Sequence, residues 1–316
     1  MKEIIVYQPI PLALLEQLKR TFKVTYVPNY RTSEREQFEA ALPTVQGLLG
    51  AGLFISEAEL AKMPQLEVVS QTIAGFDTLV VEDFVARGVM ITNAADALTD
   101  TVADLTLALT LAVARQLPAV DRAIRRDEWF KGPLDTAEGL YGTDVYGKTI
   151  GIIGLGRIGT AVAKRAHAGF GMKVIYHTRS HHLEAEQLYD AVYYADLAGL
   201  LSTAYFVIML APYNDETHQL MNETAFKTMK KSAYFINVGR GKTVDETALI
   251  KALQQGELAG AALDVFEQEP IAANHPLLQL PQVVVSAHMG SATAASRARM
   301  ISDAVTNLTA ALRDTA

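Results

Sequence analysis

Short apolar runs alternate with helix-like patterns along the whole chain, and this alternation predicts a parallel α/β fold. Near the N-terminus, the run from Glu3 to Tyr7 predicts a strand, and the residues from Leu12 to Thr21 predict a helix. The short apolar runs Gly47–Leu49 and Glu67–Ser70 predict two further strands. Strands that alternate with helices in this way are typical of parallel sheets covered by helices.

A second and more regular series begins at Lys148. It predicts a strand, a glycine turn and a helix, and then more strands and helices to the end of the chain. The expected elements are the strands Thr149–Ile153, Lys173–Tyr176, Phe206–Leu210, Ala233–Asn237, Gly260–Asp264 and Val283–Ser286, and the helices Arg157–Ala168, Glu246–Gln255 and Ala294–Leu312. Because this series starts in mid-chain, the preceding segment is expected to form its own domain, to which the final helix could return.

We therefore expect an α/β protein with two Rossmann-like, doubly wound parallel-sheet domains. The chain has 316 residues, which fits two domains of roughly 100–200 residues each. The expected substrate domain is discontinuous and comprises residues 1–98 plus 288–316. The expected dinucleotide-binding domain comprises residues 99–287.

A long apolar helix is expected to begin near Thr99, whose hydroxyl could cap it. Its most apolar part, Leu105–Ala114, is far shorter than the ~20 residues that a membrane span needs. We interpret it as a buried or interface helix and expect no membrane association. A loop that contains Trp129, Gly132 and Pro133 is expected to follow.

Composition narrows the possible functions. The net charge is −7, and no run of lysines or arginines supplies the basic face that nucleic-acid binding needs. The absence of cysteine excludes disulfides, thiolate catalysis and cysteine-ligated metals, and it fits a cytoplasmic protein. The N-terminal apolar run is interrupted so soon, by Pro9 and Pro11, that a secretory signal is not expected.

The segment Gly154-Leu-Gly156-Arg-Ile-Gly159 fits the pattern G-x-G-x-x-G between a predicted strand and a predicted helix. Gly154 permits a tight turn, Gly156 lets the backbone approach a pyrophosphate, and Gly159 allows the helix to pack closely on the strand. The start of the helix then offers free N–H groups to phosphates. The pattern predicts a dinucleotide site.

The end of the second strand of this series indicates which dinucleotide binds. An NAD site usually carries Asp or Glu there, but Thr178 stands at that position and Arg179 follows it. An arginine supplies planar, charged donors for a 2′-phosphate, so the segment favours NADPH over NADH. A solvated Arg179 with no ligand is the alternative, and NADH stays possible. His177, His181 and His182 could assist with the phosphate, and no further ligands nearby support a metal site.

Three polar residues follow the later predicted strands: Arg240, Glu269 and His288. The loops at the carboxyl ends of parallel strands border the ligand crevice, so all three could face one cleft. Reduction of a 2-keto acid needs a proton donor, which a histidine can provide near neutral pH. A neighbouring carboxylate favours the imidazolium, and an arginine can bind a substrate carboxylate and polarise the carbonyl.

At this point the chain resembles the D-isomer-specific 2-hydroxyacid dehydrogenase family over nearly its whole length. Four segments carry the resemblance in order: Gly147–Gly159, Phe235–Gly241, Leu263–Pro270 and His288–Thr293. Within the family, Arg179 after a non-acidic strand end is similar to the NADPH-preferring glyoxylate, hydroxypyruvate and 2-ketogluconate reductases.

The resemblance implies roles for individual residues. It implies that Arg240 binds the substrate, that His288 is the acid/base, that Glu269 is its carboxylate partner and that Asp264 holds the nicotinamide carboxamide. It also implies substrate-carboxylate binding by Ala74 and Gly75 and a homodimer built on the long helix. The expected cofactor-binding residues are Gly154, Gly156, Arg157, Ile158, Gly159, Thr178, Arg179, Ser180, Ala211, Pro212, Thr217, Val238, Asp264 and Gly290.

Three alternatives to this reductase remain open. One is an NAD-dependent, phosphoglycerate-like dehydrogenase, against which Arg179 and the short chain argue. Another is a dinucleotide-sensing binding protein of the same fold that acts through partners. Formate dehydrogenase is disfavoured because it lacks the carboxylate partner that Glu269 supplies.

Overall fold

The computed structural model describes residues 1–127 and 141–314, and the loop expected around Trp129, Gly132 and Pro133 lies outside these ranges. The chain divides into two compact units. The first unit comprises Met1–Leu98 and Ser291–Ala316, and the second comprises Thr99–Gly290. The segment 288–290, which the sequence placed with the first domain, therefore lies in the second unit.

The first unit is built on a five-stranded parallel sheet with the order β2-β1-β3-β4-β5. Its strands are β1 (Glu3–Val6), β2 (Lys23–Tyr26), β3 (Gly47–Gly50), β4 (Val68–Gln71) and β5 (Met90–Thr92). Its helices are α1 (Leu12–Lys19), α2 (Arg35–Ala41), α3 (Glu57–Ala61), α4 (Val81–Ala86) and α12 (Ala294–Asp314), with the 3-10 turn η1 (Leu42–Thr44).

Alternate residues of β1 serve the two faces of this sheet, as the two-residue period of a strand requires. Ile4 and Val6 pack with residues of α1 and α12, whereas Ile5 packs with residues of α2, α3 and α4. Helix α12 is contributed by the C-terminal segment, which explains why this unit is discontinuous in sequence. A Cβ on Gly47 would lie 2.9 Å from the Leu312 side chain, so α12 approaches the sheet closely there.

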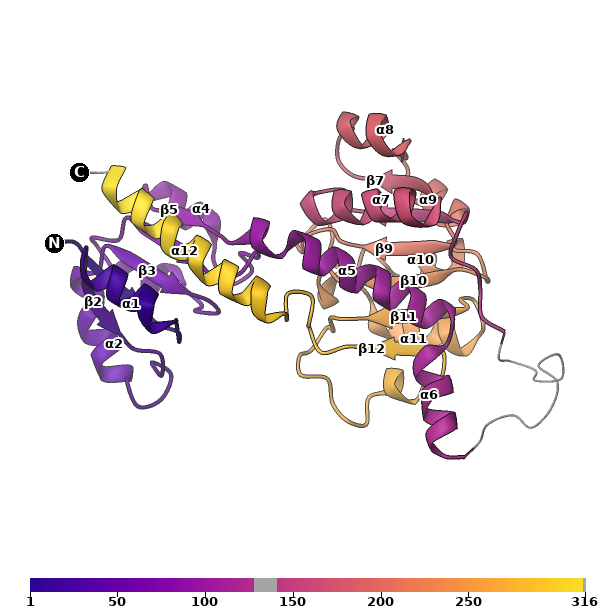
Figure 1. Ribbon diagram of the computed structural model, residues 1–316, viewed down its shortest axis with the longest axis horizontal. Coiled ribbons are helices and arrows are strands. Elements are labelled where there is room, and N and C mark those ends of the chain that lie inside the picture. Colours follow the sequence, from indigo (N-terminus) through magenta and orange to yellow (C-terminus); the bar gives the residue numbers. More distant parts are fainter. Residues whose placement is uncertain (128–140, 315–316) are drawn as a thin grey trace. The chain divides into compact units, whose positions relative to one another are not determined.

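The second unit is built on a seven-stranded parallel sheet with the order β12-β11-β10-β9-β6-β7-β8. The labelled strands β7, β9, β10, β11 and β12 follow one another in this order in Figure 1. Its strands are β6 (Thr149–Ile153), β7 (Lys173–His177), β8 (Val192–Tyr193), β9 (Phe206–Met209), β10 (Tyr234–Asn237), β11 (Gly260–Leu263) and β12 (Val283–Val285). The chain reverses its direction of travel along the sheet between β6 and β9. Such a switch point is where doubly wound sheets bind dinucleotides.

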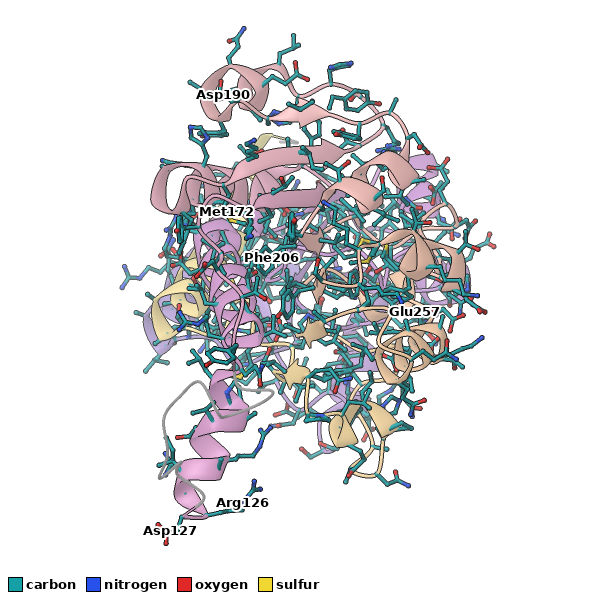
Figure 2. All side chains as sticks on the ribbon, turned by 90° about the vertical axis from the view of Figure 1, so that its right-hand side faces the viewer. Arg126, Asp127, Met172, Asp190, Phe206 and Glu257 are labelled. Atoms are coloured by element: carbon teal, nitrogen blue, oxygen red, sulfur yellow. The ribbon has the colours of Figure 1, made fainter. Side chains whose placement is uncertain are left out.

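Helices cover both faces of this sheet. Residues of α7 (Arg157–Phe170), α8 (Leu183–Tyr189) and most of α5 (Ala95–Ala114) pack with one set of apolar side chains. Residues of α9 (Leu197–Thr203), α10 (Glu223–Thr228) and α11 (Glu246–Gln254) pack with the other. The remaining elements are α6 (Leu117–Arg125) and the 3-10 turns η3 (Gly241–Thr243) and η4 (Pro276–Gln279). Phe206 on β9 is fully buried and lies in the interior, whereas Asp190 lies toward the outside (Figure 2).

Helix α5 differs from the sequence prediction. It begins at Ala95 rather than near Thr99, and Asn93 Oδ1 accepts a hydrogen bond from the Ala95 amide at its start. The whole helix has 20 residues and is, among the described residues, the one helix long and apolar enough to span a membrane by length and composition. Of its most apolar window, 56% is buried within the protein, as in the core helix of a globular domain. Its Asp100 and Asp104 both pair with Arg165 of α7, at 2.9 and 2.8 Å.

Candidate active site

The predicted functional residues of the second unit follow the carboxyl ends of neighbouring strands. Thr178 and Arg179 follow β7, the glycine turn follows β6, and Ala211 and Pro212 follow β9. Arg240 follows β10, and the segments with Glu269 and His288 follow β11 and β12. Because these strands are adjacent and parallel, the residues are arranged along one edge of the sheet. From β7 to β11 this edge spans four inter-strand spacings, or roughly 19 Å.

Glycine is required at two positions of the turn after β6. Gly154 has a φ of +97°, and a Cβ there would lie 2.6 Å from the amide nitrogen of Ala211. A Cβ on Gly159 would lie 2.4 Å from the carbonyl oxygen of Gly154. A Cβ on Gly156, in contrast, would have no atom within 4 Å. Gly154 and Gly159 therefore let the turn, the segment after β9 and the start of α7 approach one another. Gly156 leaves open space at the start of α7, where a phosphate would meet free N–H groups.

A pocket of about 420 Å³ lies at the switch point between β6 and β9. Eight of the predicted cofactor-binding residues line it: Gly154, Gly156, Thr178, Arg179, Ser180, Ala211, Pro212 and Thr217. The other six, Arg157, Ile158, Gly159, Val238, Asp264 and Gly290, do not. Five further lining residues were not predicted: Ile153, Leu155, Asn214, Glu216 and Leu220. Asn214 and Leu220 lie in an irregular loop with no motif to identify them.

The loop after β7 is tied to β8 and α8. The Tyr193 hydroxyl donates to the Thr178 carbonyl at 3.2 Å, and the His182 amide donates to the Tyr176 hydroxyl at 2.8 Å. The Tyr176 hydroxyl in turn donates to Glu186 Oε1 at 2.6 Å, and His181 Nδ1 lies 2.8 Å from the same oxygen. These contacts hold the loop in one conformation.

The same network sets the charges beside Arg179. The hydrogen bonds from Tyr176 and His181 hold the pKa of Glu186 below its ordinary value. Burial, with the contact to Glu186, raises the pKa of Tyr176 to about 12. His177, Arg179, His181 and His182 all line the pocket. The loop after β7 thus brings basic groups to the pocket and no carboxylate, although Glu216 contributes one from the loop after β9.

At the other end of the edge, His288 and Glu269 form a pair. His288 Nδ1 lies 2.7 Å from Glu269 Oε2, and Glu269 Oε1 accepts a hydrogen bond from the Phe266 amide at 3.0 Å. The His288 amide donates to the Asp264 carbonyl at 2.7 Å. His288 has a φ of +51°, which is uncommon for a residue other than glycine. Such backbone strain persists only where the surroundings impose it, and it clusters at functional sites.

Asp264 holds the loop that carries His288. Its carboxylate accepts hydrogen bonds from the Ser286 hydroxyl, from the Met289 amide at 2.7 Å and from the Gly290 amide at 2.9 Å. The residue is 1% exposed. Most of its acceptor capacity is therefore used inside the protein, where it fixes the backbone on both sides of His288.

The backbone of Arg240 is held by the side chains of two neighbouring residues. Its carbonyl accepts from Asn237 Nδ2 at 3.1 Å and from the Thr243 hydroxyl at 2.6 Å, while one guanidinium nitrogen donates to the Gly239 carbonyl at 2.8 Å. A Cβ on Gly241 would lie 1.8 Å from the Phe266 carbonyl oxygen. The loops of Arg240 and Glu269 are consequently packed backbone against backbone.

Ala74 and Gly75 lie in the first unit, in the segment that follows β4. The Ala74 carbonyl accepts from Asn93 Nδ2 at 2.8 Å, and the Ala94 amide donates to the Ile73 carbonyl at 3.1 Å. These bonds tie the segment to the end of β5. Among the described residues, no group of three or more His, Asp or Glu side chains could hold a metal ion.

Comparison with known proteins identifies relatives of the whole chain. The model of the "D-isomer specific 2-hydroxyacid dehydrogenase, NAD binding domain" family matches residues 107–290. A glyoxylate/hydroxypyruvate reductase B from Citrobacter koseri is 46% identical over 98% of this chain and 94% of its own. The structure of an NADPH-dependent glyoxylate/hydroxypyruvate reductase from Sinorhizobium meliloti, in complex with NADP and malonate, superposes with a TM-score of 0.82 at 33% identity, over 98% of this chain and 92% of its own.

Proposed function

We propose that this chain, which belongs to the D-isomer specific 2-hydroxyacid dehydrogenase family, uses NADPH to reduce glyoxylate and hydroxypyruvate to the corresponding 2-hydroxy acids. The names of the Citrobacter koseri and Sinorhizobium meliloti relatives support this substrate class. 2-Ketogluconate is a further candidate substrate, and hydroxypyruvate reduction is expected to give the D-isomer.

The pairing of His288 with Glu269 is the observation that carries the proposal. NADPH would supply the hydride to the carbonyl carbon of the keto acid. His288 would supply the proton to the carbonyl oxygen. Because Nδ1 of His288 lies 2.7 Å from Glu269, Nε2 is the ring nitrogen left to donate. The Glu269 carboxylate keeps the orientation of the ring, as a general acid requires.

Arg240 would bind the carboxylate of the keto acid and polarise its carbonyl group. A guanidinium presents forked donors that match a carboxylate, and its charge stabilises the oxygen as negative charge develops. The hydrogen bonds to the Arg240 carbonyl fix the backbone from which this side chain extends. Ala74 and Gly75 stay predicted contacts for the substrate carboxylate, and the homodimer also stays a prediction.

The pocket residues support NADP(H) as the cofactor. Gly154, Gly156 and the start of α7 would hold the pyrophosphate, and Arg179 would hold the 2′-phosphate. Thr178 places no negative charge where an NAD-specific site carries a carboxylate. The Sinorhizobium meliloti enzyme, which is NADPH-dependent and was solved with NADP, supports the same assignment.

An NAD-dependent, phosphoglycerate-like dehydrogenase is the alternative enzyme, and a dinucleotide-sensing protein is the alternative binding function. The basic loop after β7 argues against the first. The 46% identity to the glyoxylate/hydroxypyruvate reductase B from Citrobacter koseri argues against the second.

Initial rates of NADPH and NADH oxidation, measured with glyoxylate, hydroxypyruvate, pyruvate and 2-ketogluconate, test the proposal. We expect turnover of glyoxylate and hydroxypyruvate with a higher kcat/KM for NADPH. A preference for NADH would leave the enzyme class but contradict the role of Arg179. Cofactor binding without turnover of any keto acid would contradict the reductase and favour the sensing function.

A further inference from the structure

We infer that Glu246 is a positioning residue of the catalytic pair: it binds the backbone of the loop after β11 and so keeps Glu269 within hydrogen-bond distance of His288. This inference rests on the proposed roles of Glu269 and His288. Glu246 is the first residue of α11 and is only 8% exposed. It does not belong to the motifs that indicated the function.

Two consecutive backbone amides connect Glu246 to the catalytic pair. The Glu267 amide donates to Glu246 Oε1 at 2.6 Å, and the preceding amide, that of Phe266, donates to Glu269 Oε1 at 3.0 Å. The other oxygen of Glu269 lies 2.7 Å from His288 Nδ1. One short stretch of backbone is therefore held by both carboxylates, and its displacement would move Glu269 relative to His288.

The same stretch touches the Arg240 loop. Gly241 packs so closely on Phe266 that a Cβ would lie 1.8 Å from the Phe266 carbonyl oxygen and 2.4 Å from the Glu267 nitrogen. Glu246 binds that Glu267 nitrogen. A shift of the loop would consequently disturb the backbone of Arg240 as well as Glu269.

His275 completes the partners of Glu246. The Leu277 amide donates to His275 Nδ1 at 3.4 Å, so the proton of a neutral ring is on Nε2. That nitrogen lies 3.4 Å from Glu246 Oε2. Each oxygen of the buried carboxylate thus faces a donor. A glutamine could accept from only one of the two donors, because its other terminal atom is itself a donor.

Helix capping does not explain this arrangement. Asp245 caps α11, since its Oδ1 accepts from the Ala248 amide at 3.0 Å. Burial raises the pKa of Glu246, which means that the charged form is disfavoured by its surroundings. Glu223, the first residue of α10, shows the contrasting case: its side chain is 47% exposed and pairs with Lys227 and Lys251.

The experiment compares Glu246→Ala and Glu246→Gln with Glu223→Gln as the matched control. We measure kcat, the KM of the keto acid that the wild type reduces best, the Kd of NADPH, and thermal stability. For Glu246→Ala we expect kcat to fall roughly 10- to 100-fold, as for a misplaced catalytic group, with the Kd of NADPH unchanged. The kcat of Glu246→Gln should lie between those of the wild type and Glu246→Ala. The kcat of Glu223→Gln should match that of the wild type.

A second readout does not depend on turnover. Nitrogen-15 NMR of the His288 ring should show the proton on Nδ1 at high pH in the wild type, where Glu269 accepts it. In Glu246→Ala the Nε2-protonated form should increase, and Glu246→Gln provides the same test if the alanine variant fails to fold. An unchanged His288 spectrum, with any loss of kcat matched by loss of folded protein, would overturn the inference. If the wild type reduces no keto acid but the His288 spectrum responds, the proposed function fails and the positioning role stands.

Discussion

In the second unit, the functional residues lie along the sheet edge formed by the carboxyl ends of the strands, and the two ends of this edge are built differently. At β6 and β7, the pocket is shaped by glycines, backbone N–H groups and basic side chains that line an open cavity. At β10 to β12, carboxylates bind backbone amides and fix the loops of Glu269 and His288. The side chains of Asn237 and Thr243 hold the backbone of Arg240. Binding of a phosphate needs accessible donors, whereas proton transfer needs a side chain at one position. Substitutions at the two ends should therefore alter different kinetic constants.

Substitution of His288 should have the largest effect. His288→Asn removes the proton donor, so we expect kcat to fall on the order of 10²–10⁴, the usual contribution of a positioned general acid. The Kd of NADPH, measured by quenching of protein fluorescence, should stay at the wild-type value. A loss of NADPH affinity in His288→Asn would show that His288 also takes part in cofactor binding.

Arg240→Ala should lower kcat/KM for the keto acid by roughly 10²–10³, as loss of one electrostatic stabiliser does. Arg240→Lys should restore only part of the activity because an ammonium lacks the forked donors of a guanidinium. Steady-state rates at saturating NADPH measure both effects. Wild-type kcat/KM in the alanine variant would exclude Arg240 from substrate binding.

Two glycines offer a direct contrast between the ends. Gly241→Ala should reduce kcat while leaving the Kd of NADPH unchanged, because the new Cβ would lie 1.8 Å from the Phe266 carbonyl oxygen. Gly159→Ala should raise the Kd of NADPH while leaving kcat unchanged, because the new Cβ would lie 2.4 Å from the Gly154 carbonyl oxygen. Each forced contact should cost about 1–3 kcal/mol of stability, measured by urea unfolding.

Gly169→Ala is the matched control for these glycines. Its Cβ would meet no atom within 4 Å, and the position lies within α7. The alanine should be neutral, or stabilising by roughly 0.5–1 kcal/mol through the lower entropy of the unfolded chain. Equal losses in all three variants would mean that the close contacts at Gly159 and Gly241 are not the cause.

Arg179→Gln should confine its effect to one cofactor. Loss of a charged hydrogen bond of about 1.5–3 kcal/mol should raise the KM of NADPH about 10- to 100-fold. The KM of NADH should change little. Similar changes for both cofactors would place Arg179 on a part common to the two molecules rather than on the 2′-phosphate.

The buried strands and the glycine turn were predictable because their signals are local. Strands β6, β9 and β10 are apolar runs buried on both faces, and the structure confirms them within one residue. The strands that the sequence did not reveal, β2, β5 and β8, lie at sheet edges and are partly exposed. Their pairing depends on neighbours brought together only by folding.

The residues that hold the loops of the candidate site were less predictable than the three proposed catalytic residues. The sequence located Arg240, Glu269 and His288 because each follows a recognisable strand. It did not indicate that Glu246 binds the Glu267 amide 21 residues away, because a buried acceptor has no local pattern. The resemblance placed Asp264 at the nicotinamide, and the structure adds that its carboxylate holds the backbone around His288.

A double-mutant cycle of Arg179→Gln and His288→Asn tests most directly whether the two ends act separately. We would measure the Kd of NADPH and the single-turnover rate of hydride transfer to glyoxylate for the wild type, both single variants and the double variant. We expect that Arg179→Gln changes Kd, that His288→Asn changes the rate, and that the double variant shows both changes with a coupling below about 0.5 kcal/mol. A larger coupling, or a loss of NADPH affinity in His288→Asn, would contradict the division between cofactor binding and proton transfer.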